Sequence, residues 1–312
     1  MVVLDRALTV SGWSRLGNVP KGIVAMIFAS LFLAIASALT KYEVALYPTG
    51  EVLFVRSLAS LVLCGSFILP KKGLAVFDTN ILGAHAARSL SQSVSQAFTV
   101  LALGLMPLSS TIAINFSAPL WAALVSAFWL RERLTSQRLA FLIAGFVGVL
   151  IVANPGASTL QLGSLFALAN AVMYGSVTVA VRRMTKTESW QTLLMWQLLL
   201  IAAMHSLLLI FGCEAIELKD WVLLFGAGFA NGAGQYLWTR ALQLGPASAV
   251  SPFYYTMLAW AMIIGFLFWG DVPSLALVIG SVVVVGSGLM LLWHEASKRP
   301  AASQSDKLPQ RA

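Results

Sequence analysis

Apolar residues run along the chain in ten long blocks, and short polar or proline-containing segments separate each block from the next. Each block holds about twenty predominantly apolar residues, the length that an α-helix needs to cross the hydrocarbon core of a bilayer. The pattern therefore predicts an all-α membrane protein with ten transmembrane helices. The expected spans are residues 20–40, 51–70, 82–105, 108–130, 136–153, 161–181, 190–211, 220–243, 246–269 and 274–293.

The second half of the chain repeats the first at a constant offset of 139 residues, from position 96 to position 235. QAFTVLALGLMPLSS in the first half aligns without a gap with QYLWTRALQLGPASA in the second. The in-register pairs include Gln96 and Gln235, Pro107 and Pro246, and Trp121 and Trp260. Five spans in each copy would turn the second copy upside down, which is the inverted-repeat layout of a secondary transporter.

This repeat sets the expected domain organisation. We expect a cytoplasmic N-terminal segment at 1–19, a first five-helix repeat at 20–153, a second and inverted repeat at 161–293, and a polar, disordered tail at 297–312.

Composition identifies the solvent. The chain has 312 residues, of which 59% are hydrophobic and 10% charged, whereas about a quarter of the residues of a soluble domain are charged. The protein cannot cover its surface with polar groups, so we expect it to lie in a lipid bilayer. The net charge of +8 does not indicate nucleic-acid binding, because the basic residues form short clusters between apolar runs.

The basic residues also predict the orientation. With a cytoplasmic N-terminus, the inside segments hold 16 Lys and Arg residues and the outside connections hold only Lys41 and Lys219. Cytoplasmic loops of membrane proteins carry such an excess of positive charge. Both termini are therefore predicted to be cytoplasmic.

Polar side chains gather on a few of the predicted helices. Gln92 and Gln96 share one face of the third span, and Asn231 and Gln235 share one face of its repeat partner, the eighth. A polar face inside a membrane must meet other helices or a water-filled cavity, and hydrogen bonding between helices is the alternative explanation. The predicted substrate cavity consists of Gln92, Gln96, Asn115, Tyr174, Asn231, Gln235, Trp238 and Tyr254.

Ionisable residues are sparse in the predicted spans. No carboxylate lies near the middle of a span, which argues against obligatory proton antiport, although a histidine could still carry protons. Arg56 could pair with Glu51 or meet an anionic group, and Arg88 could reach the nearby membrane surface. The candidate charge partners are Arg56, Arg88 and His85, and the candidate hinge or turn residues are Pro107 and Pro246.

No catalytic or metal-binding constellation is visible. Cys64 and Cys213 fall in separate apolar segments, and the histidines are scattered. We expect no enzyme activity, no metal and no cofactor.

Two segments carry a resemblance to a known family. ALGLMPLSSTIAINFSAPLWAALVSAFWLRE and ALQLGPASAVSPFYYTMLAWAMIIGFLFWGD each contain a proline-initiated fourth helix that ends in an acidic residue. This pattern resembles the drug/metabolite transporter (DMT) superfamily, EamA type, and within it the bacterial aromatic amino-acid exporter group (YddG type). The second copy departs from the pattern in having Asp271 for the usual Glu. The resemblance implies a multi-pass bacterial inner-membrane exporter with its cavity between the two halves.

The sequence thus predicts a secondary transporter that exports small metabolites by alternating access, with aromatic or neutral amino acids as the expected substrates. The expected partners are a small-molecule substrate and the lipid bilayer, and the expected state is a monomer, with a dimer as the alternative. A multidrug or other metabolite exporter of the same superfamily is the second hypothesis. A membrane receptor or scaffold is the third, and it would normally need longer loops than this chain has.

Overall fold

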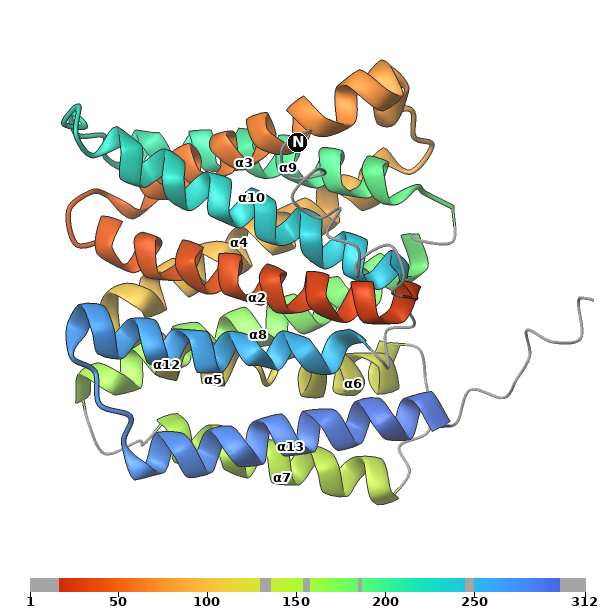
Figure 1. Cartoon of the computed structure of the whole chain (residues 1–312), viewed down its shortest axis with the longest axis vertical. Coiled ribbons are helices and arrows are strands. Elements are labelled where there is room, and N and C mark those ends of the chain that lie inside the picture. Colours follow the sequence, from red (N-terminus) through yellow and green to blue (C-terminus); the bar gives the residue numbers. More distant parts are fainter. Residues whose placement is uncertain (1–16, 130–135, 154–157, 185–186, 245–249, 298–312) are drawn as a thin grey trace, which may run out of the picture.

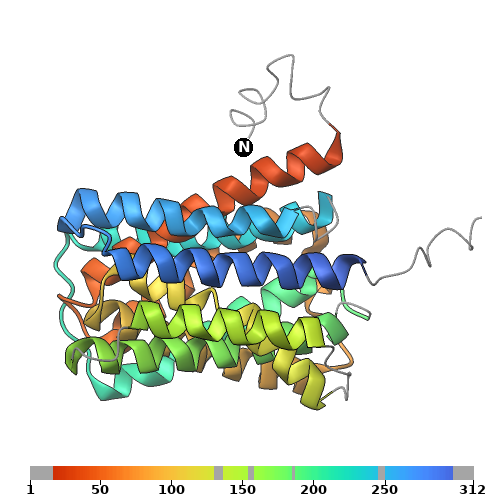
Figure 2. The same cartoon turned by 90° about the horizontal axis from the view of Figure 1, so that it is seen from below.

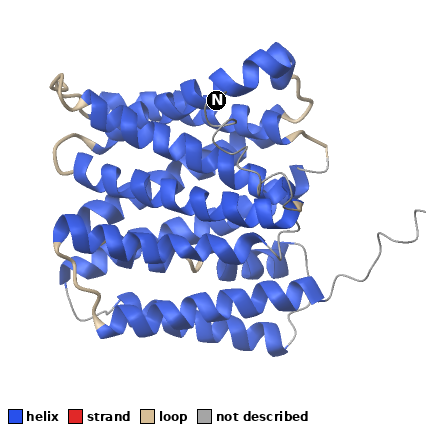
Figure 3. Ribbon diagram, in the orientation of Figure 1, coloured by secondary structure: helices blue, strands red, loops and turns tan. Residues whose placement is uncertain are grey.

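The computed structural model describes residues 17–129, 136–153, 158–184, 187–244 and 250–297, and throughout these ranges the regular secondary structure is helical (Figure 3). The long helices of the first half are α2 (Asn18–Glu43), α3 (Thr49–Lys72), α4 (Leu82–Leu105), α5 (Leu108–Asn115), α6 (Ala118–Trp129) and α7 (Ser136–Ala153). Those of the second half are α8 (Ser158–Met184), α9 (Trp190–Ser206), α10 (Trp221–Leu244), α12 (Thr256–Trp269) and α13 (Leu275–Ser297). Short 3-10 segments are η1 (Gly73–Phe77), η2 (Leu207–Phe211) and η3 (Ser251–Tyr255).

The helices form one bundle in which neighbours run side by side. In Figure 1 the bundle extends from α3 and α9 at one side to α7 and α13 at the other, and Figure 2 shows α7 and α13 on the outer face. Helix α2 packs on α10, and α4 packs on α8. The pairs α3 with α9 and α7 with α13 join the two halves of the chain at opposite sides of the bundle.

Five helical stretches of the described chain are long and apolar enough to cross a membrane. They are Asn18–Glu43, Thr49–Phe77, Leu108–Val125, Trp190–Phe211 and Pro252–Trp269, and shorter apolar helices cover Leu139–Ala153, Leu162–Val177 and Leu275–Leu291. Helix α4 is in neither set, because buried polar residues such as His85, Arg88 and Gln92 dilute its apolar character. The count of ten spans therefore stays a prediction.

The expected span at 108–130 is not one continuous helix. Helix α5 ends at Asn115 and α6 begins at Ala118, with Phe116 and Ser117 in a turn between them. Pro119 explains the break, since it has no N–H to donate to the carbonyl oxygen of Asn115 four residues earlier. The described part of the expected span at 246–269 is also not one continuous α-helix, because the 3-10 segment η3 precedes α12 there.

Glycine allows the closest approaches between helices. A Cβ atom at Gly175 in α8 would lie 2.8 Å from the backbone oxygen of Ala118, at the start of α6. A Cβ atom at Gly280 in α13 would lie 2.8 Å from the backbone oxygen of Gly148 in α7. Side chains at these positions would force the helices apart, so small residues set the spacing here, as is common between helices in membranes.

Candidate functional site

A chain of hydrogen-bonded polar side chains lies at the break between α5 and α6. The Ser95 hydroxyl of α4 donates to Oδ1 of Asn170 in α8, and Nδ2 of Asn170 donates to Oδ1 of Asn115 at 2.7 Å. The helix break places the backbone carbonyl of Asn115 beside this cluster without its usual i+4 donor, because residue 119 is proline. Three helices, one of them from the second half of the chain, therefore bring amide and hydroxyl groups together.

Aromatic rings lie next to this polar cluster. Phe116 packs edge-on against Tyr254, with ring centroids 5.6 Å apart, and lies 4.9 Å from the ring of Tyr255. Tyr174 lies close enough to Tyr254 for the two phenol groups to interact electrostatically. The site thus combines hydrogen-bonding amides with an aromatic wall contributed by both halves of the chain.

Arg56 lies buried between α2 and α4. Its Nη2 donates to Oε1 of Gln96 at 3.0 Å, and its Nη1 donates to the Thr40 hydroxyl at 3.3 Å. The expected alternative of an Arg56–Glu51 pair is wrong, because the Glu51 carboxylate accepts the backbone N–H of Glu214 at 3.1 Å. In the folded bundle Arg56 therefore pairs with the amide of Gln96 in α4 and not with the Glu51 carboxylate of its own helix.

Glu43 is the acidic side chain whose charge interacts with that of Arg56. It lies in the last turn of α2, is only 1% exposed, and neither of its carboxylate oxygens has a hydrogen-bond partner. Arg56 exerts the charge interaction on it. The sequence placed Glu43 at the end of a span, but packing of the neighbouring helices excludes it from solvent.

Arg88 is also buried, and it does not reach toward the membrane surface. Its guanidinium donates to the backbone oxygen of Leu193 at 3.0 Å and to Oε1 of Gln197, both in α9. It lies within electrostatic range of Tyr174. The snorkelling interpretation is therefore wrong, since α9 supplies the acceptors that solvent would otherwise supply.

His85 is fully buried in the first turn of α4. Its Nε2 lies 4.0 Å from the Glu188 carboxylate, and its ring lies 5.9 Å from that of Trp196. Glu188 also accepts a hydrogen bond from the Thr79 hydroxyl at 2.6 Å. The histidine therefore faces the α9 side of the bundle, away from the α5–α6 break.

The remaining predicted cavity residues divide into different roles. Asn231 donates to the Ser60 hydroxyl at 3.0 Å and so links α10 to α3. Trp238 packs against the cluster that contains Met26. Gln92 is buried in α4, while the half-buried side chain of Gln235 has no hydrogen-bond partner among the described residues.

The structure describes one of the two candidate hinge prolines. Pro107 is the N-cap residue of α5, with φ −56° and ψ 145°. Pro246 lies outside the described residues, so its expected role as a turn residue stays a prediction.

The predicted site did not include three residues that the structure brings into these clusters: Ser95, Asn170 and Gln197. The spacing of Asn170 and Tyr174, one turn apart on the same helix, was a usable signal for the first cluster. Nothing in the sequence pairs Gln197 with Arg88, because that contact depends on the packing of α4 against α9.

Hydrogen bonds connect the helix ends near Lys41. Nζ of Lys41 donates to the backbone oxygens of Met106 at 2.7 Å and Leu103 at 3.3 Å. The Tyr47 hydroxyl donates to the Asp220 carboxylate at 2.7 Å, and this hydrogen bond raises the pKa of the Tyr47 phenol. We call this end of the bundle, where α2 ends and α3 begins, the Lys41 end.

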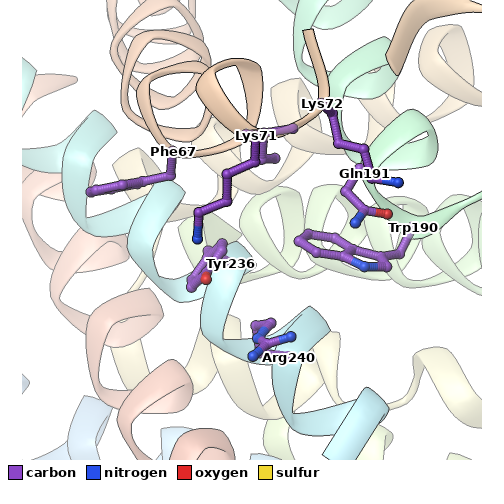
Figure 4. Close-up of a pocket in the computed structure, with 8 residues that line it drawn as sticks. Phe67, Lys71, Lys72, Trp190, Gln191, Tyr236 and Arg240 are labelled. Carbon is purple, nitrogen blue, oxygen red and sulfur yellow. The ribbon is translucent and has the colours of Figure 1, made fainter. Parts of the chain in front are cut away.

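A cavity of about 240 Å³ opens at the opposite side of the bundle, which we call the Lys71 end (Figure 4). It lies among the C-terminal part of α3, the first turn of α9 and the C-terminal part of α10. Its lining residues are Phe67, Ile68, Lys71, Lys72, Trp190, Gln191, Tyr236 and Arg240.

A family profile described as the EamA-like transporter family matches the chain twice, over residues 20–154 and 161–293. The chain belongs to the EamA-like transporter family. It is therefore a membrane protein that transports small molecules, and the resemblance to the EamA type of the DMT superfamily is confirmed.

Several bacterial EamA relatives have named substrates. The chain is 26% identical over 282 residues to the riboflavin transporter of Vibrio cholerae, covering 89% of this chain and 95% of the relative. It is 23% identical over 267 residues to the pseudopaline exporter of Pseudomonas aeruginosa, covering 85% and 93%. It is 22% identical over 257 residues to the S-adenosylmethionine uptake transporter of Rickettsia bellii, covering 82% and 88%.

A solved crystal structure shares the fold of this chain. It superposes with a TM-score of 0.63 at 21% sequence identity and covers 88% of this chain and 98% of its own. The relatives above are named as transporters of riboflavin, pseudopaline and S-adenosylmethionine, so they do not single out the aromatic amino-acid exporter group.

Proposed function

We propose that this EamA protein is a bacterial inner-membrane secondary transporter for small neutral or zwitterionic metabolites that carry a planar ring. The observation that carries the proposal is the Ser95–Asn170–Asn115 hydrogen-bond chain beside Phe116 and Tyr254. Amides would bind the polar groups of such a solute and the aromatic rings would contact its apolar part, as is usual in small-molecule sites.

The helix break at Asn115 supports this location. Secondary transporters place their substrate sites near the bilayer midplane, at interrupted helices whose free backbone groups contact the solute. The break leaves the Asn115 carbonyl without an N–H donor from residue 119, close to side chains from both halves. A solute bound here would touch both halves at once.

Two inverted five-helix repeats and alternating access form the proposed mechanism. The packing pattern supports the repeat: exchanging each element for its counterpart in the other half turns the α2–α10 pair into the α8–α4 pair. The α3–α9 and α7–α13 pairs map onto themselves under the same exchange. Such a pattern is expected of two similar halves related by a pseudo-two-fold axis.

Aromatic and neutral amino acids are the first substrate class to test, with export as the expected direction. A flavin is the second candidate, because a riboflavin transporter is among the relatives with high coverage. Aromatic amino acids and flavins both carry a planar ring and hydrogen-bonding groups, and they differ in the size of the cavity that they need. A multidrug exporter is less consistent with the site, because no carboxylate lies in the polar cluster described here to attract a cation.

The direct test is flux through the purified protein in liposomes. We would load the vesicles separately with phenylalanine, tryptophan, leucine, riboflavin or S-adenosylmethionine and measure counterflow of the labelled solute. Asn115→Leu should lower the flux of the true substrate several-fold. Thr99→Val is the matched control, because Thr99 bonds only to the Ser95 carbonyl of its own helix at 3.3 Å. If no panel member exchanged, or if Asn115→Leu exchanged normally, the proposed site would be wrong.

A further inference from the structure

The cavity at the Lys71 end has a chemistry that the transport site does not use. Lys71 and Lys72 come from the last turn of α3, and Arg240 comes from the C-terminal part of α10. All three are exposed, and among the described residues no acidic side chain lines the cavity. Three positive charges around one hollow without a negative neighbour should attract an anion.

The first turn of α9 adds to this positive field. Ser189 is the N-cap residue of α9, and its hydroxyl accepts the backbone N–H of Thr192 at 3.2 Å. Trp190 and Gln191 follow as the first helical residues and line the cavity. The N-terminus of a helix carries a partial positive charge, so it reinforces the three cationic side chains.

Aromatic rings lie among these cations. The ring of Tyr236 lies 6.3 Å from that of Phe67 and 6.3 Å from that of Trp190, so rings from α3, α9 and α10 meet (Figure 4). The hollow therefore combines three cationic side chains with three aromatic rings.

The order of these groups along the helices distinguishes the kind of anion. Phe67 precedes Lys71 by four residues in α3, and Tyr236 precedes Arg240 by four residues in α10. One helical turn rises about 5.4 Å, so on both helices an aromatic ring lies one turn deeper in the bundle than a cation. Membrane interfaces have the same layering, with basic groups at phosphate depth and tyrosine and tryptophan just below.

From these observations we propose that this cavity binds the headgroup of an anionic phospholipid. The phosphate would lie among Lys71, Lys72 and Arg240, and the glycerol and upper acyl chain would lie on Phe67, Tyr236 and Trp190. Basic pockets between transmembrane helices bind such headgroups. This inference requires only that the chain lies in a membrane, so it can fail or succeed independently of the proposed substrate.

The test is lipid retention by the full-length protein. We would equilibrate the purified protein with equal parts of phosphatidylglycerol and phosphatidylcholine of the same acyl chains and detect bound lipid by native mass spectrometry. The wild type should retain phosphatidylglycerol preferentially. Each basic residue near a lipid surface contributes about 1 kcal/mol, so Lys72→Gln and Arg240→Gln should each weaken retention about five-fold.

Controls separate the lipid site from general charge and from misfolding. Lys21→Gln removes a cation of the described chain that does not line the cavity, and it should retain lipid like the wild type. The Lys72 and Arg240 side chains are exposed and that of Lys21 is half-buried, and none of the three pairs with an acidic residue in the described structure. An unchanged elution profile and melting temperature are therefore expected for each single variant. Equal retention of both lipids by the wild type, or unchanged preference in the two cavity variants, would overturn the proposal. Displacement of the lipid by soluble glycerol phosphate at matched concentration would also overturn it, because the site would then recognise phosphate alone.

Discussion

Arg56 donates a hydrogen bond to Gln96 over 3.0 Å, which joins a buried guanidinium of α3 to a residue of α4 that sequence analysis assigned to the substrate cavity. Only 7% of Arg56 is exposed, and its Nε has no partner in the described structure. Gln96 and Thr40 are thus the two described side chains that accept hydrogen bonds from this guanidinium. Gln96 therefore stabilises the fold, whether or not it also contacts the substrate.

We therefore expect Gln96→Leu to destabilise the protein. Removing one partner of a buried hydrogen bond costs about 1–3 kcal/mol, and more when the remaining group is charged. Gln235→Leu is the matched variant at the same repeat position, and it leaves no described hydrogen bond unpaired. Thermal unfolding of both proteins in one detergent should show a clear fall in Tm for Gln96→Leu and little change for Gln235→Leu. Equal shifts would mean that the Arg56 contact contributes nothing to stability.

The Asn115–Asn170 hydrogen bond predicts coupled effects on transport. Asn115→Leu and Asn170→Leu each leave the other amide without its partner, and each also removes a polar group from the proposed site. Each single variant already breaks the Asn115–Asn170 hydrogen bond, so the double variant breaks no further bond between these two residues. Its fold-loss of flux should therefore be smaller than the product of the two single fold-losses. A double-mutant cycle of liposome flux measures this coupling. Independent, multiplicative losses would indicate that the two amides do not act together.

Helix packing at Gly175 predicts a steric effect. A Cβ there would lie 2.8 Å from both the Ala118 oxygen and the Ala122 nitrogen, and backbone atoms cannot move aside easily. Overpacking of this kind costs about 1–3 kcal/mol, so Gly175→Ala should lower folded yield and Tm. The control is Gly286→Ala in α13, where nothing lies within 4 Å of the new Cβ. Fluorescence-detected size exclusion of both variants measures the difference, and a normal Gly175→Ala would contradict the α6–α8 packing.

Sequence periodicity was sufficient for the helices but not for their contacts. The apolar blocks predicted helical segments close to α2, α3, α4 and α7, because an apolar run between polar punctuation is a local signal. The break after Asn115 was also readable in principle, from the proline at 119. It was overlooked because the apolar run continues across it without interruption.

The side-chain clusters depended on contacts between distant segments. Asn115 and Asn170 are 55 residues apart, and Arg88 and Gln197 are 109 apart. The repeat predicted which helices correspond, but it did not predict which amide on a polar face meets which partner. Glu43 illustrates the limit, because the sequence places it just beyond the first expected span, and only the packing of the bundle shows that it is buried.

The orientation of the chain is testable with reporter fusions. The excess of Lys and Arg on one side predicts cytoplasmic termini. Fusions after residues 156 and 217 should therefore give an external signal, and a fusion after residue 186 an internal one. Alkaline phosphatase and green fluorescent protein report the two sides in opposite senses and so check each other. A cytoplasmic signal at 156 would contradict the scheme of five spans in each half.

Alternating access predicts that linking the two halves at one end stops transport. At the Lys41 end, a Cβ at Gly50 of α3 would lie 2.7 Å from the backbone oxygen and 2.9 Å from the Cβ of Leu208 in η2, so η2 must shift to admit Gly50→Cys. With Leu208→Cys beside it, the pair should then form a disulfide. At the Lys71 end, Phe67 and Tyr236 have ring centroids 6.3 Å apart, so cysteines at these positions suit a short bifunctional maleimide.

Both pairs belong in a background without the native thiols, because Cys213 is exposed and would compete for oxidant, while Cys64 is buried. Oxidation of the first pair should abolish liposome flux, and reduction should restore it, because a half that cannot separate from its partner cannot open that end of the bundle. Gly50→Cys alone should be insensitive to oxidant, which separates the effect of the link from that of the substitution at Gly50. Crosslinking at the Lys71 end should stop flux by holding the other side closed. If both linked proteins exchanged solute at the rate of their unlinked forms, the two halves would not move against each other, and a mechanism that leaves both ends in place would be required.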